Sequence, residues 1–229
     1  MRLAVVVPAG HKSAEPEPWS SLGATSVLVV HEQMPAPLDD IDVVVVLDHL
    51  PHTLVPVLGA FVKRGGPVLG MGPGVHALCS AGFLPGRLRE PANDVRAQRL
   101  ACCVRTEGRS TPFSAGIPAG RVLQAAWSSA LVYACESPID LEAGGQVVFR
   151  HCDPWGGVGD KHNPFAATGA IAGISNREGH VVGVTCPLDF ETPPSPLVVQ
   201  MFASAALWVA QKQRAGEPSM TKPSKARKG

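Results

Sequence analysis

Residues 70–74 are the place in this chain where residue types and spacing come closest to a catalytic device. A short apolar run at 67–69 favours a buried strand, and residues 75–78 favour the start of a helix. Strand, tight glycine turn and helix form the G-x-nucleophile-x-G elbow, in which a Ser or Cys is exposed above the helix N-terminus. The central residue here is Gly72, which has no side chain to attack a substrate. The segment is therefore either an ordinary glycine turn or an elbow without its nucleophile.

The elements that position this turn alternate between strand and helix in the first half of the chain. Strands are predicted at 3–7, 26–30, 42–47 and 67–70, and helices at 54–63 and 75–82. Within the strand predicted at 42–47, the residues after Asp42 are all apolar, which is typical of a central parallel strand. Strand–helix alternation predicts an α/β fold: a mostly parallel sheet with helices on both faces.

The second half of the chain predicts an antiparallel extension of that sheet. Strands are predicted at 99–106, 120–126, 145–150, 170–175 and 180–185, and residues 176–179 are typical of a hairpin turn. A closing helix is predicted from Pro196 to about Gln213. We expect one domain over 1–211, followed by a basic, disordered tail over 212–229 with six Lys or Arg and one Glu.

Composition argues against several classes of partner. The 229 residues have a formal net charge of +1, so no strong overall field attracts nucleic acid, and the basic tail from Lys222 to Lys228 is a weak exception. No apolar stretch approaches the roughly 20 residues that span a bilayer. The six cysteines lack C-x-x-C spacing and are expected to be free thiols. We expect a cytoplasmic protein without a metal, a cofactor or a membrane contact. The adjacent His151, Cys152 and Asp153 are expected in a loop, not as a metal site.

Several segments, in order, resemble one family. They are residues 66–70, 81–86, 111–113, 147–150, 163–164, 171–176 and 181–184. Together they are similar to class I glutamine amidotransferases, above all the glutaminase subunit of phosphoribosylformylglycinamidine synthase, the PurQ type. The likeness covers about residues 1–210, with apparent deletions near 8–19 and 50–55. It implies a flavodoxin-like, Rossmann-like fold.

The resemblance also implies where the family's catalytic groups fall in this chain. The nucleophilic Cys falls on Gly72 and the Asn after it on Pro73. The family's H-P-E segment falls on residues 186–189, so the base position is Pro187 with Asp189 as the acid, or Cys186 with Leu188. Neither alignment supplies a His. The family's oxyanion strand end is replaced by residues 47–50, and its H-G-E-G stretch by 127–130.

These changes predict a pseudo-glutaminase that docks on a large synthase-type partner in a structural or regulatory role. Docking candidates, as the resemblance implies, are Asn163, Pro164, Ile171 and Asn176. Candidates for lining the former substrate pocket are Asp48, His49, Gly72, His76, Cys186 and Asp189. The alternative is an active enzyme, either of purine-type amidotransfer or of repurposed Cys-dependent chemistry in the same pocket. That alternative requires a thiol of lowered pKa at the sheet edge.

Overall fold

The structure is a computed structural model that describes residues 1–10, 15, 17–32, 38–89, 103–125, 138–153, 164–186 and 194–216. Its strands are β1 (Arg2–Val6), β2 (Ser26–Val30), β3 (Val43–Val46), β4 (Val68–Met71), β5 (Gly86–Leu88), β6 (Cys103–Thr106), β7 (Val122–Gln124), β8 (Ile139–Leu141), β9 (Gln146–Cys152), β10 (Ile171–Ser175) and β11 (Val181–Val184). Its helices are α1 (Glu17–Ser20), α2 (Val55–Lys63), α3 (Pro73–Ser80), α4 (Pro164–Thr168) and α5 (Pro196–Gly216), with short 3-10 turns η2 (Leu38–Asp40) and η3 (His52–Leu54).

The main sheet has the strand order β2-β1-β3-β4-β11-β10-β9-β6-β7 in the described part of the chain. The pairs from β2 to β11 are parallel, and those from β11 to β7 are antiparallel. This arrangement confirms the predicted α/β fold with a parallel centre and an antiparallel extension. The strand β4 lies between β3 and β11, so the turn after it opens at the middle of the sheet.

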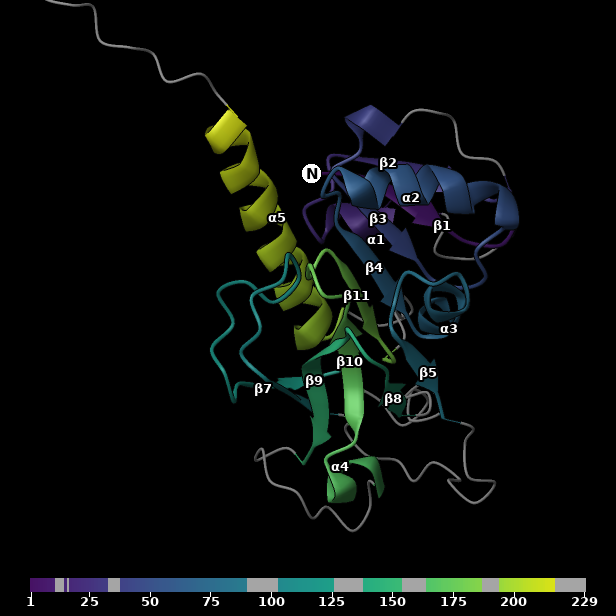
Figure 1. The fold of residues 1–229 in the computed structure, drawn as a ribbon. Coiled ribbons are helices and arrows are strands. Elements are labelled where there is room, and N and C mark those ends of the chain that lie inside the picture. Colours follow the sequence, from purple (N-terminus) through teal and green to yellow (C-terminus); the bar gives the residue numbers. More distant parts are fainter. Residues whose placement is uncertain are drawn as a thin grey trace, which may run out of the picture.

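Helices cover both faces of the sheet (Figure 1). On one face α1 and α5 meet, and the Trp19 ring lies 5.8 Å from that of Phe202. On the other face α2 and α3 bury Leu58, Phe61 and Leu78 in a second core cluster. Successive residues of β1 and β3 alternate between these two clusters because successive side chains of a strand point to opposite faces.

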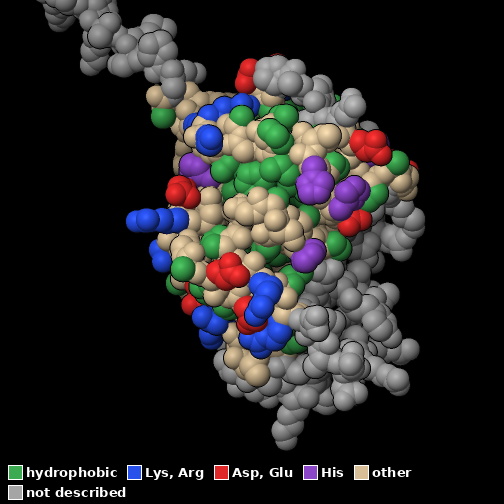
Figure 2. Space-filling view, turned by 45° about the vertical axis from the view of Figure 1, so that its right-hand side comes forward, with side chains coloured by type: hydrophobic (Ala, Val, Ile, Leu, Met, Phe, Trp, Pro, Cys, Tyr) green, Lys and Arg blue, Asp and Glu red, His purple; other side chains and the backbone are tan. Residues whose placement is uncertain are grey.

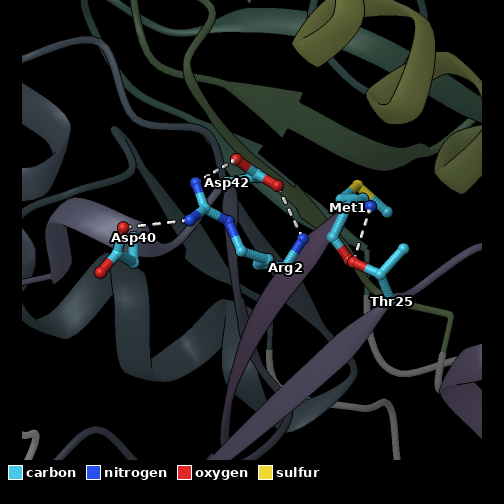
Figure 3. A network of polar contacts seen from close by, with 5 residues as sticks. All are labelled: Met1, Arg2, Thr25, Asp40 and Asp42. Carbon is cyan, nitrogen blue, oxygen red and sulfur yellow. Dashed lines mark hydrogen bonds and ion pairs between the residues drawn. The ribbon is translucent and has the colours of Figure 1, made fainter.

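The starts of the first three strands are tied together by polar contacts (Figure 3). The backbone N–H of Arg2 donates to Asp42 Oδ2 at 2.7 Å. The guanidinium group of Arg2 donates to Asp40 Oδ1 at 3.0 Å. The N-terminal amine of Met1 donates to Thr25 Oγ1 at 3.3 Å. These contacts fix the start of β1 between β2 and β3, at the edge of the sheet opposite to the turn after β4.

Four details depart from the predicted boundaries. The helix α3 begins at Pro73, two residues early, because proline is preorganised for the first turn of a helix. The strand β9 runs on to Cys152, so His151 lies in a strand and not in a loop. The small antiparallel sheet of β5 and β8 was not predicted. The helix α5 continues to Gly216, so its last turn lies inside the range expected to be tail.

Lys212, near the end of α5, contacts the turn between α2 and β4. Its Nζ donates to the Gly65 carbonyl oxygen at 3.1 Å and lies 5.0 Å from the ring of Trp208. The residues of the expected tail after 216 lie outside the described part of the chain, as do 99–102 of the predicted strand 99–106. No described helix is long and apolar enough to cross a membrane.

Candidate functional site

The turn after β4 has the backbone geometry of an elbow. Gly72 is buried at the N-cap of α3 with φ 52° and ψ −125°. That φ lies in the left-handed half of conformational space, which glycine enters without steric cost. The Gly72 N–H donates to the Val184 carbonyl oxygen at 3.1 Å, and the Gly72 carbonyl accepts from the Val75 N–H at 3.1 Å. The turn is thereby anchored both to β11 and to its own helix.

Close packing requires glycine at position 74 and favours it at position 70. A Cβ added to Gly74 would lie 2.0 Å from the carbonyl oxygen of Val46, at the end of β3. A Cβ added to Gly70 would lie 2.6 Å from Leu78 Cδ1, the end of a flexible side chain, and 3.2 Å from the Gly74 carbonyl oxygen. The close approach of α3 to the end of β3 therefore depends on Gly74 above all.

Two chemical groups of a working elbow are missing at this turn. Gly72 offers no nucleophile at the centre. In a nucleophile elbow the residue after the nucleophile supplies a backbone N–H to the oxyanion hole. That residue is Pro73, at the first position of α3, and proline has no N–H to donate.

Cys186 lies in the core and does not line the pocket beside the turn. It is 1 % exposed and belongs to the cluster under α5. Burial, and then the nearby thiol of Cys103, raise the pKa of Cys186 to about 12. A nucleophilic thiol needs the opposite shift. The requirement of the repurposed Cys chemistry is therefore not met at Cys186.

Burial also raises the pKa of two other described thiols, those of Cys79 and Cys152. Burial, and then the charge of Glu142, raise the pKa of the half-buried Cys79 to about 11. Burial is also the main cause that raises the pKa of Cys152 to about 12. These cysteines behave as small apolar residues. Among the described residues, no group of three His, Cys, Asp or Glu side chains could hold a metal ion.

A pocket of about 740 Å³ lies beside the turn, and we call it the histidine pocket. Its polar lining consists of Asp48, His49, His52, His76 and Ser80. Its apolar lining consists of Leu50, Val55, Pro56, Pro73, Ala77, Ala81 and Leu88. Figure 2 shows histidine side chains gathered on the right-hand part of the view, the side that carries α2 and α3 in Figure 1.

The structure thus brings three of the candidate pocket residues together: Asp48, His49 and His76. Gly72 lies behind Pro73 and is not among the lining residues. His52 and Ser80 also line the pocket but were missed by sequence reasoning. The available signals were the spacing of His52 three residues after His49, and that of Ser80 one helical turn after His76.

The described candidate docking residues lie on two elements, β10 with the turn after it and α4. Ile171 begins β10 and Asn176 follows its other end, so five residue steps of about 3.3 Å place them about 17 Å apart. Asn176 Oδ1 accepts from the Val181 N–H at 3.1 Å, and its Nδ2 donates to Glu178 at 3.1 Å. These bonds hold the hairpin turn. Pro164 begins α4, which packs on β9.

Several candidates lie outside the described residues. They are Asn163, Pro187, Leu188, Asp189 and the stretch 127–130. Of the positions that the resemblance assigns to the base and the acid, the structure describes Cys186. The others are known by residue type alone.

The chain is similar in sequence to known proteins over part of its length. The chain is 36 % identical over 135 residues to the phosphoribosylformylglycinamidine synthase subunit PurQ of Moorella thermoacetica, covering 57 % of this chain and 56 % of that protein. It is 39 % identical over 138 residues to the PurQ subunit of Symbiobacterium thermophilum, covering 56 % and 57 %. This stretch of the chain is PurQ-like. The chain spans little more than half the length of those relatives. No family model matches the chain.

Solved structures share the fold. The chain superimposes on a chain of the Thermotoga maritima PurLQS structure with a TM-score of 0.66 at 16 % identity, covering 91 % of this chain and 98 % of that one. A glutamine amidotransferase of the same organism gives 0.51 at 12 % identity, with 95 % and 86 % covered. At these identities the likeness shows the fold: that of class I glutamine amidotransferases.

Proposed function

We propose that this protein is a PurQ-like subunit that docks on a phosphoribosylformylglycinamidine synthase-type partner without hydrolysing glutamine itself. The observation that carries the proposal is Gly72, a residue without a side chain at the left-handed centre of a turn that has the backbone geometry of an elbow. The proposal places the protein in the cytoplasm, in a structural or regulatory role in purine biosynthesis.

The proposed lack of glutaminase activity rests on three independent features. Gly72 provides no nucleophile, Pro73 provides no oxyanion donor, and neither alignment of residues 186–189 provides a His base. Removal of the nucleophile alone costs on the order of 10⁶ in rate in a well-studied triad enzyme. Burial and the raised pKa of Cys186 argue against that thiol as a substitute.

The proposed docking rests on the PurQ-like stretch and the shared fold. The relatives bear the name of a synthase subunit, and the Thermotoga maritima structure is titled as a PurLQS assembly. Both kinds of likeness favour a large synthase-type partner. Such a partner would use free ammonia or another nitrogen donor while this subunit supports its fold or assembly.

Co-purification tests the docking. The full chain, tagged, is expected to retain the synthase homologue of the same genome through size-exclusion chromatography. Ile171→Thr is expected to weaken the complex if the start of β10 faces the partner, whereas Val199→Thr is the control at a 49 % exposed position on α5. Failure of the unmodified chain to bind any synthase homologue of its genome would contradict the docking role.

A further inference from the structure

The histidine pocket lies along one side of α3, beside the turn at Gly72. Its wall on α3 is formed by Pro73, His76, Ala77, Ser80 and Ala81. These residues recur at i, i+3, i+4, i+7 and i+8, which defines one face of a helix. Val75 and Leu78 of α3 are buried in the second core cluster, whereas His76 and Ser80 on the pocket side are exposed.

Small side chains on this face give the pocket its depth. Ala77, Ser80 and Ala81 contribute little volume, and the facing wall comes from Leu50, Val55 and Leu88. A pocket of about 740 Å³ lies within the range of roughly 300–1,000 Å³ that small-molecule sites occupy. An apolar wall with a few convergent polar groups is the usual composition of such a site.

The polar lining selects the chemistry of the ligand. Asp48 is a half-buried carboxylate, which accepts hydrogen bonds and does not donate them. Among the described residues that line it there is no Lys and no Arg, the side chains that usually recognise phosphate and carboxylate groups. Three imidazoles offer flat faces for stacking as well as ring nitrogens for hydrogen bonds. This combination disfavours an anion and favours a flat molecule with N–H donors.

We infer that the histidine pocket binds a planar amino-substituted nitrogen heterocycle. An amino group beside a ring N–H matches a carboxylate with two parallel hydrogen bonds, as Asp does when it accepts from an exocyclic amine of a base. Asp48 is the acceptor, and His76 with the apolar wall contacts the ring. This binding goes beyond the proposed docking role and does not depend on it, because all of the residues concerned belong to this chain.

Calorimetric titration of the full chain with 2-aminobenzimidazole tests the inference. Benzimidazole, which lacks the amino group, and benzoate, a flat anion, are the matched probes. We expect saturable binding of 2-aminobenzimidazole, at least tenfold tighter than binding of either control. Equal or tighter binding of benzimidazole or benzoate, or no saturable binding of the amino compound, would overturn the inference.

Three variants locate the binding. Asp48→Asn is expected to weaken 2-aminobenzimidazole about 10- to 100-fold, the loss expected for hydrogen bonds to a charged group. Ser80→Tyr, at an exposed position, is expected to abolish binding by filling the pocket while the chain stays folded. Arg177 lies in the exposed hairpin turn before β11, at the end of the central strands opposite to the pocket. The Arg177→Ala variant should bind 2-aminobenzimidazole as the unmodified chain does. Undiminished binding by a folded Ser80→Tyr variant would place the ligand elsewhere and refute the assignment.

Discussion

The backbone N–H of Gly72 donates to the carbonyl oxygen of Val184 across 3.1 Å, joining the turn after β4 to the end of β11. In the family that the sequence resembles, the nucleophile occupies the position of Gly72, and the base lies shortly after the position of Val184. The framework that would hold the two groups together is thus present, while the side chain at Gly72 is absent.

Gly74 should be the least replaceable residue of the turn. Gly74→Ala places a Cβ 2.0 Å from the Val46 carbonyl oxygen, and backbone cannot move aside as a flexible side chain can. We expect it to lower the free energy of unfolding by about 1–3 kcal/mol or more. Urea denaturation measures the loss. The control is Gly59→Ala inside α2, where the nearest atom is 3.9 Å away and helix propensity predicts a gain of about 0.5–1 kcal/mol. Equal effects of the two changes would contradict this packing.

Gly72→Cys should restore the residue type of a nucleophile without restoring glutaminase activity. The left-handed φ of 52° disfavours any side chain, so we expect a loss of about 1–3 kcal/mol in thermal or urea unfolding. Pro73 still lacks an N–H, and residues 186–189 still lack a His. Ammonia release from glutamine by this variant, above that of a denatured sample, would show that the elbow lost only its nucleophile.

Cys186 should react slowly with alkylating reagents. Burial raises its pKa to about 12, so almost no thiolate exists at neutral pH. Iodoacetamide at low concentration and pH 7.4, followed by mass-spectrometric mapping, should leave Cys186 and Cys152 unmodified until the protein is unfolded in urea. Rapid and selective labelling of Cys186 in the folded protein would revive a Cys-dependent activity.

Acid should destabilise the protein through His151. Burial lowers the pKa of His151 from 6.5 to about 4, so the unfolded chain binds its proton more readily than the folded one. The stability due to the neutral form is complete above pH 6.5 and is lost as the pH falls toward 4, by up to about 3 kcal/mol. Urea denaturation between pH 7.5 and 4 should show this loss in the unmodified chain and a flatter profile in His151→Phe. An unchanged slope in that variant would assign the effect to other groups.

His180 provides the comparison for this titration. Burial, and then the charge of Lys212, lower the pKa of His180 as well. Its ring is less buried than that of His151 and lies edge-on to Trp208 at 6.0 Å. His180→Gln is therefore expected to change the pH profile in the same direction but by less than His151→Phe.

Local sequence patterns were sufficient to predict the central strands and the elbow. The strand β3 is a run of four valines, and Gly70 and Gly74 mark a turn that sterics require. The β5–β8 pair was not predictable, because two three-residue strands more than fifty positions apart give no periodic signal. The extension of β9 to Cys152 depends on pairing with Cys103 of β6, which is a tertiary contact.

The composition of the histidine pocket could be predicted only in part. Asp48, His49 and His76 follow from the position of an elbow beside the end of β3. His52 reaches the pocket through the short turn η3 that leads into α2, and Leu88 reaches it from β5. The spacing of His52 three residues after His49 was its only signal, and Leu88 had none because the β5–β8 pair that places it is a tertiary contact.

The absence of glutamine hydrolysis is the central property proposed for this protein. The direct measurement is ammonia release from glutamine by the full chain, alone and with the synthase homologue of its genome, against a heat-denatured sample. We predict a rate equal to that of the denatured sample in both cases, while the synthase remains active with free ammonia. Glutamine turnover above the denatured control, with or without the partner, would contradict the account.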